Sequence, residues 1–254
     1  MILAQLTDTH IKSNRRKAYG RVDTAAMLDA AVKHINAFEP AIDVVLVSGD
    51  LTDRGEPEEF YALRESLKNI SMPWHVIPGN HDDRCNFLEA FADHDYLEDS
   101  ASFIHYIIDD YPLQLIGLDT TVDEKPYGFL PAKRLEWLDA CLASEPEKPT
   151  LLFMHHPPFE VKESKHPWQY DNQESIELFG NALEGQTQVL RAFCGHSHRN
   201  ANGFISDVPA SCVPSVAIDV RLGSFPNSAK TKPVYQLHTY KSRQGFFTET
   251  RAAN

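Results

Sequence analysis

The chain has 254 residues, 42% of them hydrophobic, which is enough for the core of one large domain or two small ones. Its formal net charge of −12, from 24 Lys and Arg against 36 Asp and Glu, argues against nonspecific binding to a nucleic-acid polymer. No apolar run approaches the roughly 18 residues of a membrane span, and the sequence from Met1 lacks a signal-peptide pattern, so we expect a cytoplasmic protein without membrane contact.

Short runs rich in Val, Ile and Leu alternate with amphipathic segments over the first 91 residues. The patterns predict strands over 2–7, 44–48 and 75–78, and helices over 23–38, 57–70 and 84–91. In the first helical segment, Leu28, Ala31, Val32 and Ile35 recur at helical spacing. Strands alternating with helices in this order are typical of βαβ units.

Strand patterns dominate the remaining chain. We expect strands over 103–108, 113–118, 150–154, 189–194, 212–218, 233–239 and 244–249, with a helix over 131–143. The polar loop 160–172 is long enough to be functional. No repeat or low-complexity linker interrupts the sequence, so we predict one domain over 1–254, built from two packed sheets with helices outside. The four cysteines form no CxxC pair, which favours reduced thiols.

Possible metal ligands follow five of the predicted strands. Ligand sites of α/β proteins lie at the carboxyl ends of strands, so these side chains are expected to converge. The expected cluster comprises Asp8, His10, Asp50, Asn80, His155, His196 and His198. Each motif alone has a plainer interpretation as a helix cap or a turn. Their occurrence at five strand ends favours a metal centre.

Seven ligands are too many for one tetrahedral zinc ion. They suit two divalent cations joined by a carboxylate. The donors are nitrogen and oxygen without thiolate, which fits Mn, Fe, Zn or Co and argues against a structural zinc site. Two such cations would also give this acidic chain a local positive centre for any anionic substrate.

The motifs Asp8-x-His10, GDLTDRG at 49–55, GNHD at 79–82, HHPP at 155–158 and Gly195-His196-x-His198 together resemble the calcineurin-like metallophosphoesterase superfamily. The resemblance is closest to its class III cyclic-nucleotide phosphodiesterase and glycerophosphodiesterase branch. It covers residues 3 to about 200 and becomes weaker after that point, although residues 215–220 still resemble a strand near the end of the domain in that branch. It implies an α/β fold, namely a four-layer αββα sandwich of two mixed β-sheets flanked by helices.

The resemblance also implies which ligands hold which cation. Asp8, His10, Asp50 and His198 would hold one, while Asp50, Asn80, His155 and His196 would hold the other. Asp50 would then be the bridge. Of the adjacent histidines, His155 matches the ligand position of the family, and His156 is assigned to the surroundings of the substrate.

The implied activity is hydrolysis of a small phosphodiester by a metal-bound hydroxide. We place 3',5'-cyclic nucleotides ahead of glycerophosphodiesters as substrates. A phosphomonoesterase using the same site, or a non-catalytic scaffold, are the alternatives, although known scaffolds of this superfamily have typically lost the histidines present here. The branch commonly assembles, so a homo-oligomer, a dimer or larger, is expected.

Departure of an alkoxide requires a proton. His81, next to Asn80, is therefore the predicted general acid. Asp53 is predicted to orient and charge His81, with an exposed turn residue as the alternative. Arg54 could bind a phosphate oxygen, or it could be an exposed arginine at the start of a helix. Trp168 and Tyr170 could stack on a nucleobase, but local packing is the more common role of such residues.

Overall fold

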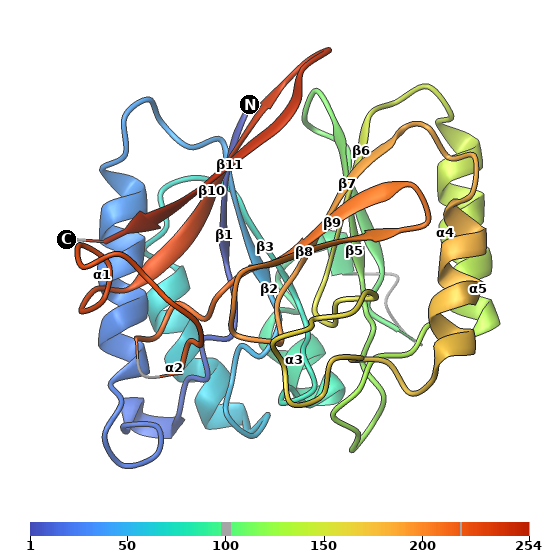
Figure 1. Cartoon of the computed structure of the whole chain (residues 1–254). Coiled ribbons are helices and arrows are strands. Elements are labelled where there is room, and N and C mark those ends of the chain that lie inside the picture. Colours follow the sequence, from blue (N-terminus) through green and yellow to red (C-terminus); the bar gives the residue numbers. More distant parts are fainter. Residues whose placement is uncertain (98–102, 219, 254) are drawn as a thin grey trace.

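The computed structural model describes residues 1–97, 103–218 and 220–253. Its elements form four layers, with helices on the outer faces of two sheets that pack against each other (Figure 1). This arrangement confirms the predicted αββα sandwich. The helices are α1 Thr24–Asn36, α2 Pro57–Leu67, α3 Arg84–Ala90, α4 Ala132–Ser144 and α5 Gln173–Leu183, with short 3-10 turns at Ser13–Arg15 and Asp95–Leu97.

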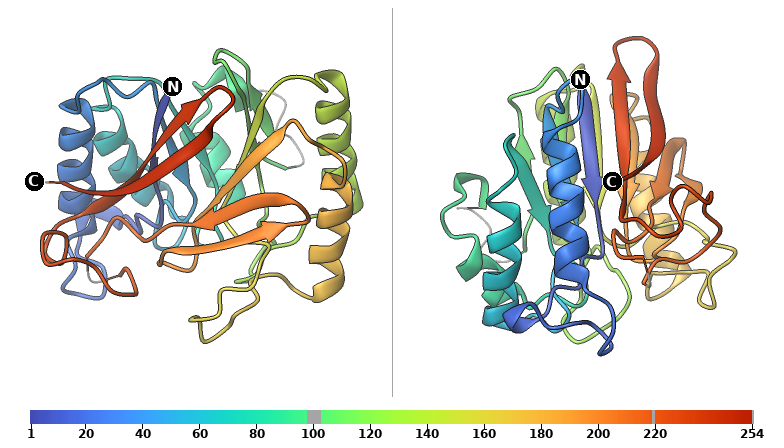
Figure 2. Two further views of the ribbon diagram at one scale, coloured as in Figure 1. Left: turned by 45° about the horizontal axis from the view of Figure 1, so that its top comes forward. Right: turned by 90° about the vertical axis from the view of Figure 1, so that its left-hand side faces the viewer.

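The first sheet has the strand order β11-β10-β1-β2-β3. Its members are β1 Ile2–Leu6, β2 Val44–Ser48, β3 Trp74–Ile77, β10 Val234–Lys241 and β11 Gly245–Ala252. Strands β1, β2 and β3 are parallel, whereas β10 and β11 form an antiparallel hairpin that pairs with β1. Figure 2 shows this C-terminal hairpin beside the N-terminus in both views.

The second sheet has the strand order β4-β5-β6-β7-β9-β8, with antiparallel pairing at both edges. Its members are β4 Tyr106–Ile108, β5 Gln114–Leu118, β6 Thr150–Met154, β7 Val189–Cys194, β8 Ala201–Ile205 and β9 Val208–Cys212. Strands β5, β6, β7 and β9 run parallel. The two sheets are therefore both mixed, as predicted.

The alternating direction of side chains along β6 explains how the layers pack together. Leu151 and Phe153 belong to the core between the sheets and under α1 and α2, while Leu152 and Met154 pack with α4 and α5. All five residues of β6 are buried. Successive side chains of a strand point to opposite faces, so a strand covered on both faces reads as a continuous apolar run.

Most predicted elements are confirmed to within three residues at each end. Helix α5 was not predicted, although Asn172 caps it by accepting a hydrogen bond from the Ser175 N–H and Phe179 and Leu183 are buried. Strands β8 and β9 were also not predicted as such. The predicted strand at 212–218 is wrong, because β9 ends at Cys212 and the buried segment after it crosses toward the first sheet.

This crossing segment contains Pro214, which has no N–H for a sheet ladder. The Val216 N–H donates to the Thr7 carbonyl at 3.2 Å, and Ser215 Oγ donates to the Asp8 carbonyl at 2.7 Å. The segment thereby supports the turn that carries Asp8. Residue 219 of the predicted late strand lies outside the described residues.

A buried ion cluster centred on Asp119 joins α3 and α4 to the end of β5. The carboxylate accepts from Arg84 Nε at 3.0 Å and from the Thr121 N–H at 2.8 Å, and Arg134 lies 3.6 Å away. Burial acts to raise the pKa of Asp119, but Arg134 and Arg84 outweigh it and lower this pKa.

Asp119→Asn is expected to lower the free energy of unfolding by about 3 kcal/mol at pH 7, because two partly buried guanidinium groups lose their counter-charge. A carboxyl with a lowered folded-state pKa stabilises above its unfolded-state pKa, and this contribution is lost as the pH falls through the folded-state value. The wild-type advantage should thus shrink below about pH 4. Urea unfolding measures both effects.

Asp123→Asn is the matched control, because Asp123 pairs with the same Arg84 but its side chain is 83% exposed. It should change the free energy of unfolding by less than about 1 kcal/mol. Equal losses in the two variants would contradict a special role for the buried carboxylate.

Candidate metal centre

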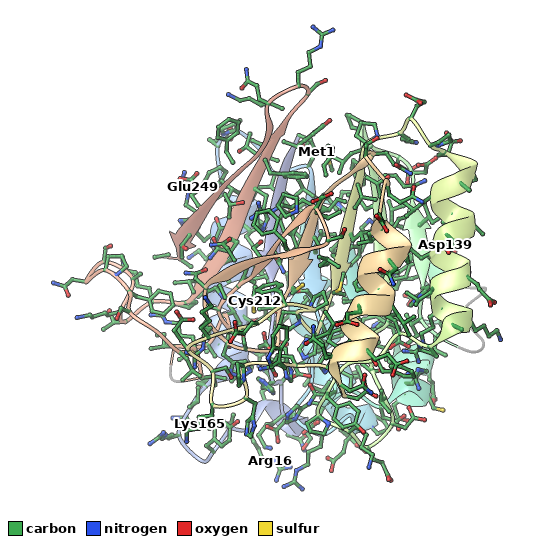
Figure 3. The ribbon with its side chains drawn as sticks, turned by 45° about the vertical axis from the view of Figure 1, so that its right-hand side comes forward. Met1, Arg16, Asp139, Lys165, Cys212 and Glu249 are labelled. Atoms are coloured by element: carbon green, nitrogen blue, oxygen red, sulfur yellow. The ribbon has the colours of Figure 1, made fainter. Side chains whose placement is uncertain are left out.

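The carboxyl ends of five strands bring the seven predicted ligands to one edge of the sandwich. Asp8 and His10 follow β1, Asp50 follows β2, Asn80 follows β3, His155 follows β6, and His196 and His198 follow β7. The loops after β1 and β6 carry Arg16 and Lys165, which Figure 3 shows at this edge, whereas Met1 lies toward the other.

The first group of donors surrounds Asp8. His198 Nε2 lies 3.2 Å from Asp8 Oδ1, and His10 Nε2 lies 3.1 Å from His198 Nε2. His10 Nε2 is also 3.8 Å from Asp50 Oδ2. One atom from each of these four side chains lies within 4.8 Å of all the others. Such spacing suits a single cation.

The second group begins at the other oxygen of Asp50. Asp50 Oδ1 lies 3.2 Å from His155 Nε2, which is 3.2 Å from His196 Nδ1. Asp50 therefore faces both groups, as a bridging carboxylate must. Asn80 Oδ1 is buried and has no hydrogen-bond partner among the described residues.

Tests of chemical fit favour cations in both groups. Pairs of imidazole nitrogens face each other at 3.1 and 3.2 Å, so each pair needs a proton or a cation between its lone pairs. His155 Nδ1 contacts the Ser48 carbonyl at 2.9 Å and His198 Nδ1 contacts the Val220 carbonyl at 3.1 Å. A carbonyl only accepts, so both Nδ1 atoms carry the hydrogen and both Nε2 atoms are left as ligands.

The ionisation states of Asp50, His10 and His196 fit metal binding as well. Burial acts to raise the pKa of Asp50, but His155 and His10 outweigh it and hold this pKa well below its usual range. Burial lowers the pKa of His10 to about 4 and that of His196 to about 3, so both rings are neutral at pH 7. Burial acts to lower the pKa of His155, but Asp50 outweighs it and raises this pKa to about 9, and Asp8 likewise raises the pKa of His198. Ionised carboxylates and neutral imidazoles are the forms that bind metal, so these two rings must release any proton they carry when a cation binds.

Five of the seven candidate ligands have left-handed backbone conformations. The φ values are 51° for Asp8, 44° for His10, 46° for Asp50, 69° for His196 and 53° for His198. This region is uncommon for residues other than glycine, and strained backbone clusters at functional sites. The fold holds these side chains in place at a conformational cost.

Glycines allow the close approach of the ligand-bearing turns. A Cβ at Gly79 would lie 2.2 Å from Asp50 Oδ1, and one at Gly49 would lie 2.4 Å from His155 Nδ1. Neither contact is sterically possible without movement of a ligand. The glycine before Asn80 is thus required by packing, and the glycine before Asp50 is required by packing and by its left-handed φ of 89°.

Gly79→Ala is expected to weaken divalent-metal binding by about 10- to 100-fold, the range found when a supporting residue of a metal site is lost. Isothermal titration with Mn²⁺ measures this. Gly180→Ala is the matched control, because a Cβ there meets only the Ser206 nitrogen at 3.8 Å. Unchanged Mn²⁺ affinity in Gly79→Ala would contradict the requirement for a glycine beside Asp50.

His81 lies at the edge of the first donor group. Its ring centroid is 4.9 Å from that of His10. The main-chain N–H of His81 donates to Asp50 Oδ1 at 3.0 Å. The main-chain carbonyl of Asp53, rather than its carboxylate, contacts His81 Nδ1 at 2.7 Å. The Asp53 carboxylate pairs with Lys12. The sequence motif cannot show whether Asp53 contacts His81 through its main-chain carbonyl or through its carboxylate.

Two further predicted site residues occupy different surroundings. The Arg54 side chain is 71% exposed, and its Nε lies 3.8 Å from Asp53 Oδ2. His156 is fully buried, with Nδ1 at 2.8 Å from Thr120 Oγ1 and its ring centroid 4.5 Å from that of His196. Its Nε2 is buried without a hydrogen-bond partner among the described residues. The nitrogens of His155, His156 and His196 lie within 4.8 Å of one another.

Two residues support the candidate ligands, namely Asp82 and Thr7. The GNHD motif predicted that Asp82 supports its turn rather than binding metal, whereas the role of Thr7 was not predicted. Asp82 accepts hydrogen bonds from the N–H groups of Leu51, Thr52 and Gly79, so it ties the two ligand turns together. Thr7 Oγ1 donates to Asp8 Oδ2 at 2.8 Å. For Thr7, the signal available in the sequence was its position directly before the Asp8-x-His10 motif.

Burial distinguishes the two aromatic residues of loop 160–172 that were candidates for base stacking. Tyr170 is buried, whereas Trp168 is 45% exposed, so only Trp168 presents a ring to solvent. Cys194 is fully buried in the core under α4 and α5, and all four cysteines are free thiols.

The fold and the site define an αββα protein with a candidate two-cation centre at the edge of its sheets. Residues 1–200 match the family of calcineurin-like phosphoesterases. The chain belongs to this family, which confirms the prediction from the motifs.

The chain is 37% identical over 254 residues to a protein of Arcobacter nitrofigilis named probable glycerophosphodiester phosphodiesterase GpdQ. This match covers 98% of the chain and 92% of that protein. Identity is 28% over 218 residues to the 3',5'-cyclic adenosine monophosphate phosphodiesterase CpdA of Escherichia coli K12, covering 83% and 76%. Both substrate classes of the predicted branch thus occur among its relatives.

A purple acid phosphatase from yellow lupin seeds has the same fold, with a TM-score of 0.68 at 13% identity. That alignment covers 100% of the chain and 51% of the phosphatase. Among the described helices, none has both the length and the apolar character needed to cross a membrane.

Proposed function

We propose that this chain is a metal-dependent phosphodiesterase that hydrolyses glycerophosphodiesters. The observation that carries the proposal is the position of Asp50, whose two carboxylate oxygens face two separate groups of nitrogen and oxygen donors. Relatives named as phosphodiesterases support the reaction class.

Two divalent cations fit the donors. Asp8, His10, Asp50 and His198 would hold the first, and Asp50, Asn80, His155 and His196 would hold the second. The set contains no thiolate, so Mn, Fe, Co and Zn are the candidate metals. When bound, two such cations activate water as a nucleophile and neutralise charge on the phosphoryl oxygens.

His81 is the proposed general acid. The Asp53 carbonyl accepts a hydrogen bond from His81 Nδ1, so Nδ1 carries a hydrogen. When the ring is charged, Nε2 carries the second proton and is the atom that can donate it. Burial acts to lower the pKa of His81, but Asp50 and the Asp53 carbonyl outweigh it and raise this pKa. A charged His81 can protonate the departing alcohol oxygen.

The surrounding residues would act on the acid and on the substrate. Asp53 positions His81 through its carbonyl, and its carboxylate holds Lys12 beside it. His156 would donate from Nε2 to a phosphoryl oxygen if Thr120 donates to Nδ1, and the buried, unpartnered Nε2 supports this role. Arg54 is free to reach an oxygen of the substrate because most of its side chain is exposed.

Glycerophosphodiesters are placed ahead of cyclic nucleotides, which reverses the order expected from the motifs. The 37% match to the Arcobacter nitrofigilis protein extends over 98% of the chain and thus includes the strands after residue 200. Cyclic 3',5'-nucleotides remain the second candidate, because a probable cyclic nucleotide phosphodiesterase of Rhodopseudomonas palustris is also 37% identical, over 213 residues. The predicted cytoplasmic location, homo-oligomer and single domain stay predictions.

Initial rates at fixed Mn²⁺ test the proposal. The substrates are glycerophosphoethanolamine, 3',5'-cyclic AMP, bis(4-nitrophenyl) phosphate and 4-nitrophenyl phosphate. The largest kcat/KM is expected for glycerophosphoethanolamine. Faster turnover of 4-nitrophenyl phosphate than of bis(4-nitrophenyl) phosphate, which has the same leaving group, would favour a phosphomonoesterase. No turnover of any ester would favour the scaffold alternative.

A further inference from the structure

A cavity of about 450 Å³ lies at the amino end of β3, where Trp74 and His75 begin the strand. Strands β1, β2 and β3 are parallel, and the candidate metal ligands follow their carboxyl ends. This cavity is therefore at the opposite edge of the first sheet from the metal centre. Its volume falls in the range of small-molecule sites.

Four aromatic rings line this cavity, namely those of Trp74, His75, His94 and Tyr96. The ring centroids of Trp74 and His94 are 4.6 Å apart, those of His94 and Tyr96 are 5.3 Å apart, and those of His75 and Tyr96 are 5.0 Å apart. The Tyr96 hydroxyl accepts a hydrogen bond from the Val76 N–H at 3.3 Å, which fixes the ring against β3. The aromatic wall is thus held by contacts to the sheet.

The charged groups of the wall are all acidic. Asp93, Asp95 and Asp110 line the cavity, and its described lining includes no Lys or Arg. Arg64 neutralises Asp93 through two contacts of 2.6 Å. Asp95 and Asp110 form no ion pair within the described parts of the chain and supply a negative potential.

Both histidines of the wall are neutral at pH 7. Burial lowers the pKa of His75 to about 4, and burial also lowers the pKa of His94. His75 is only 8% exposed, and neither of its ring nitrogens has a hydrogen-bond partner in the described residues. The cavity therefore combines neutral aromatic rings, an unpartnered polar ring and unpaired carboxylates.

We propose that this cavity binds a small methylated ammonium ion. Aromatic rings attract cations through their electron-rich faces, and nearby carboxylates add a long-range attraction. Asp95 and Asp110 are exposed, so a direct ion pair with either is weakened by water. The rings are the less hydrated partners and favour a weakly hydrated, methylated cation over a primary ammonium. The site is independent of the proposed hydrolytic function.

Saturation-transfer NMR with three probes tests this. Choline carries the methylated cation, 3,3-dimethylbutanol has the same shape without charge, and ethanolamine carries a primary ammonium. Choline should bind the intact protein at least about tenfold more tightly than either of the others. Equal binding of 3,3-dimethylbutanol would overturn the proposal, because the cavity would then recognise only apolar shape.

Two variants locate the binding site. Trp74→Leu should weaken choline binding about tenfold and leave diester turnover unchanged. Trp168→Leu is the matched control, because Trp168 is an exposed tryptophan of loop 160–172 and does not line the cavity. An equal loss in Trp168→Leu, or none in Trp74→Leu, would show that choline binds elsewhere.

Asp95→Lys tests the same site at a position that does not contribute to the core, in case Trp74→Leu fails to fold. Asp95 is exposed, so its replacement should leave folding intact and should weaken choline binding by placing a positive charge at the rim. Asp207→Lys, at an exposed turn between β8 and β9, controls for the change in net charge. Undiminished choline binding in Asp95→Lys would contradict the proposed site.

Discussion

Asp50→Asn is expected to lower diester turnover at least about a thousandfold, beyond the 10- to 100-fold typical when only a supporting residue of a metal site is lost. The reason is geometric, since among the described residues Asp50 is the carboxylate that faces both donor groups, at 3.8 Å from His10 and 3.2 Å from His155. Asparagine preserves the shape and one oxygen but removes the charge that joins two cations.

The decisive measurement is metal content. Wild-type protein saturated with Mn²⁺ and then desalted should retain two ions per chain, whereas Asp50→Asn should retain one or none. Asp53→Asn is the matched control, because this carboxylate pairs with Lys12 and belongs to neither donor group. Two retained ions in Asp50→Asn would contradict the bridging role.

His81→Asn should show the second largest effect, with a dependence on the leaving group. For a diester that releases an alkoxide, kcat should fall by about 10²- to 10⁴-fold, the usual contribution of a general acid. For bis(4-nitrophenyl) phosphate the fall should be far smaller, because nitrophenolate departs without a proton. Parallel kinetics on the two substrates measure the difference.

His166→Asn is a suitable control, because His166 is an exposed histidine in loop 160–172. It should leave both rates unchanged. If His81→Asn instead slows both substrates equally, His81 acts in binding or positioning and another group supplies the proton.

The convergence of the candidate ligands was predictable because each follows a strand whose apolar pattern is plain in the sequence. In a largely parallel sheet, the carboxyl ends must meet at one edge. Asp8 and Asp50 follow neighbouring parallel strands of the first sheet, so their proximity follows from this rule. His155 follows β6 of the second sheet, and it meets Asp50 because the two sheets pack with these edges together. Chain order and residue type together placed the candidate centre.

The details of the site depend on contacts that no local pattern records. The left-handed backbone of Asp8 and Asp50 is imposed by neighbouring turns, since Asp8 donates its N–H to the Gly49 carbonyl. Motif spacing also could not show that His81 meets the carbonyl of Asp53 rather than its carboxylate. These are tertiary interactions between residues far apart in the chain or between backbone groups.

The errors in the fold have similar causes. Helix α5 contains Gly180 and a polar first turn, which weaken its helical pattern, yet burial of Phe179 against the second sheet stabilises it. The segment after Cys212 is apolar because it passes between the sheets beneath Asp8, and an apolar run alone does not separate such a crossing from a strand.

Anomalous diffraction from crystals of the Mn²⁺-loaded protein tests the central claim most directly. We expect two peaks about 3.5–4 Å apart, with the carboxylate of Asp50 bound to both ions. A single peak, or two peaks that share no carboxylate, would contradict the two-cation centre on which the proposed hydrolysis depends.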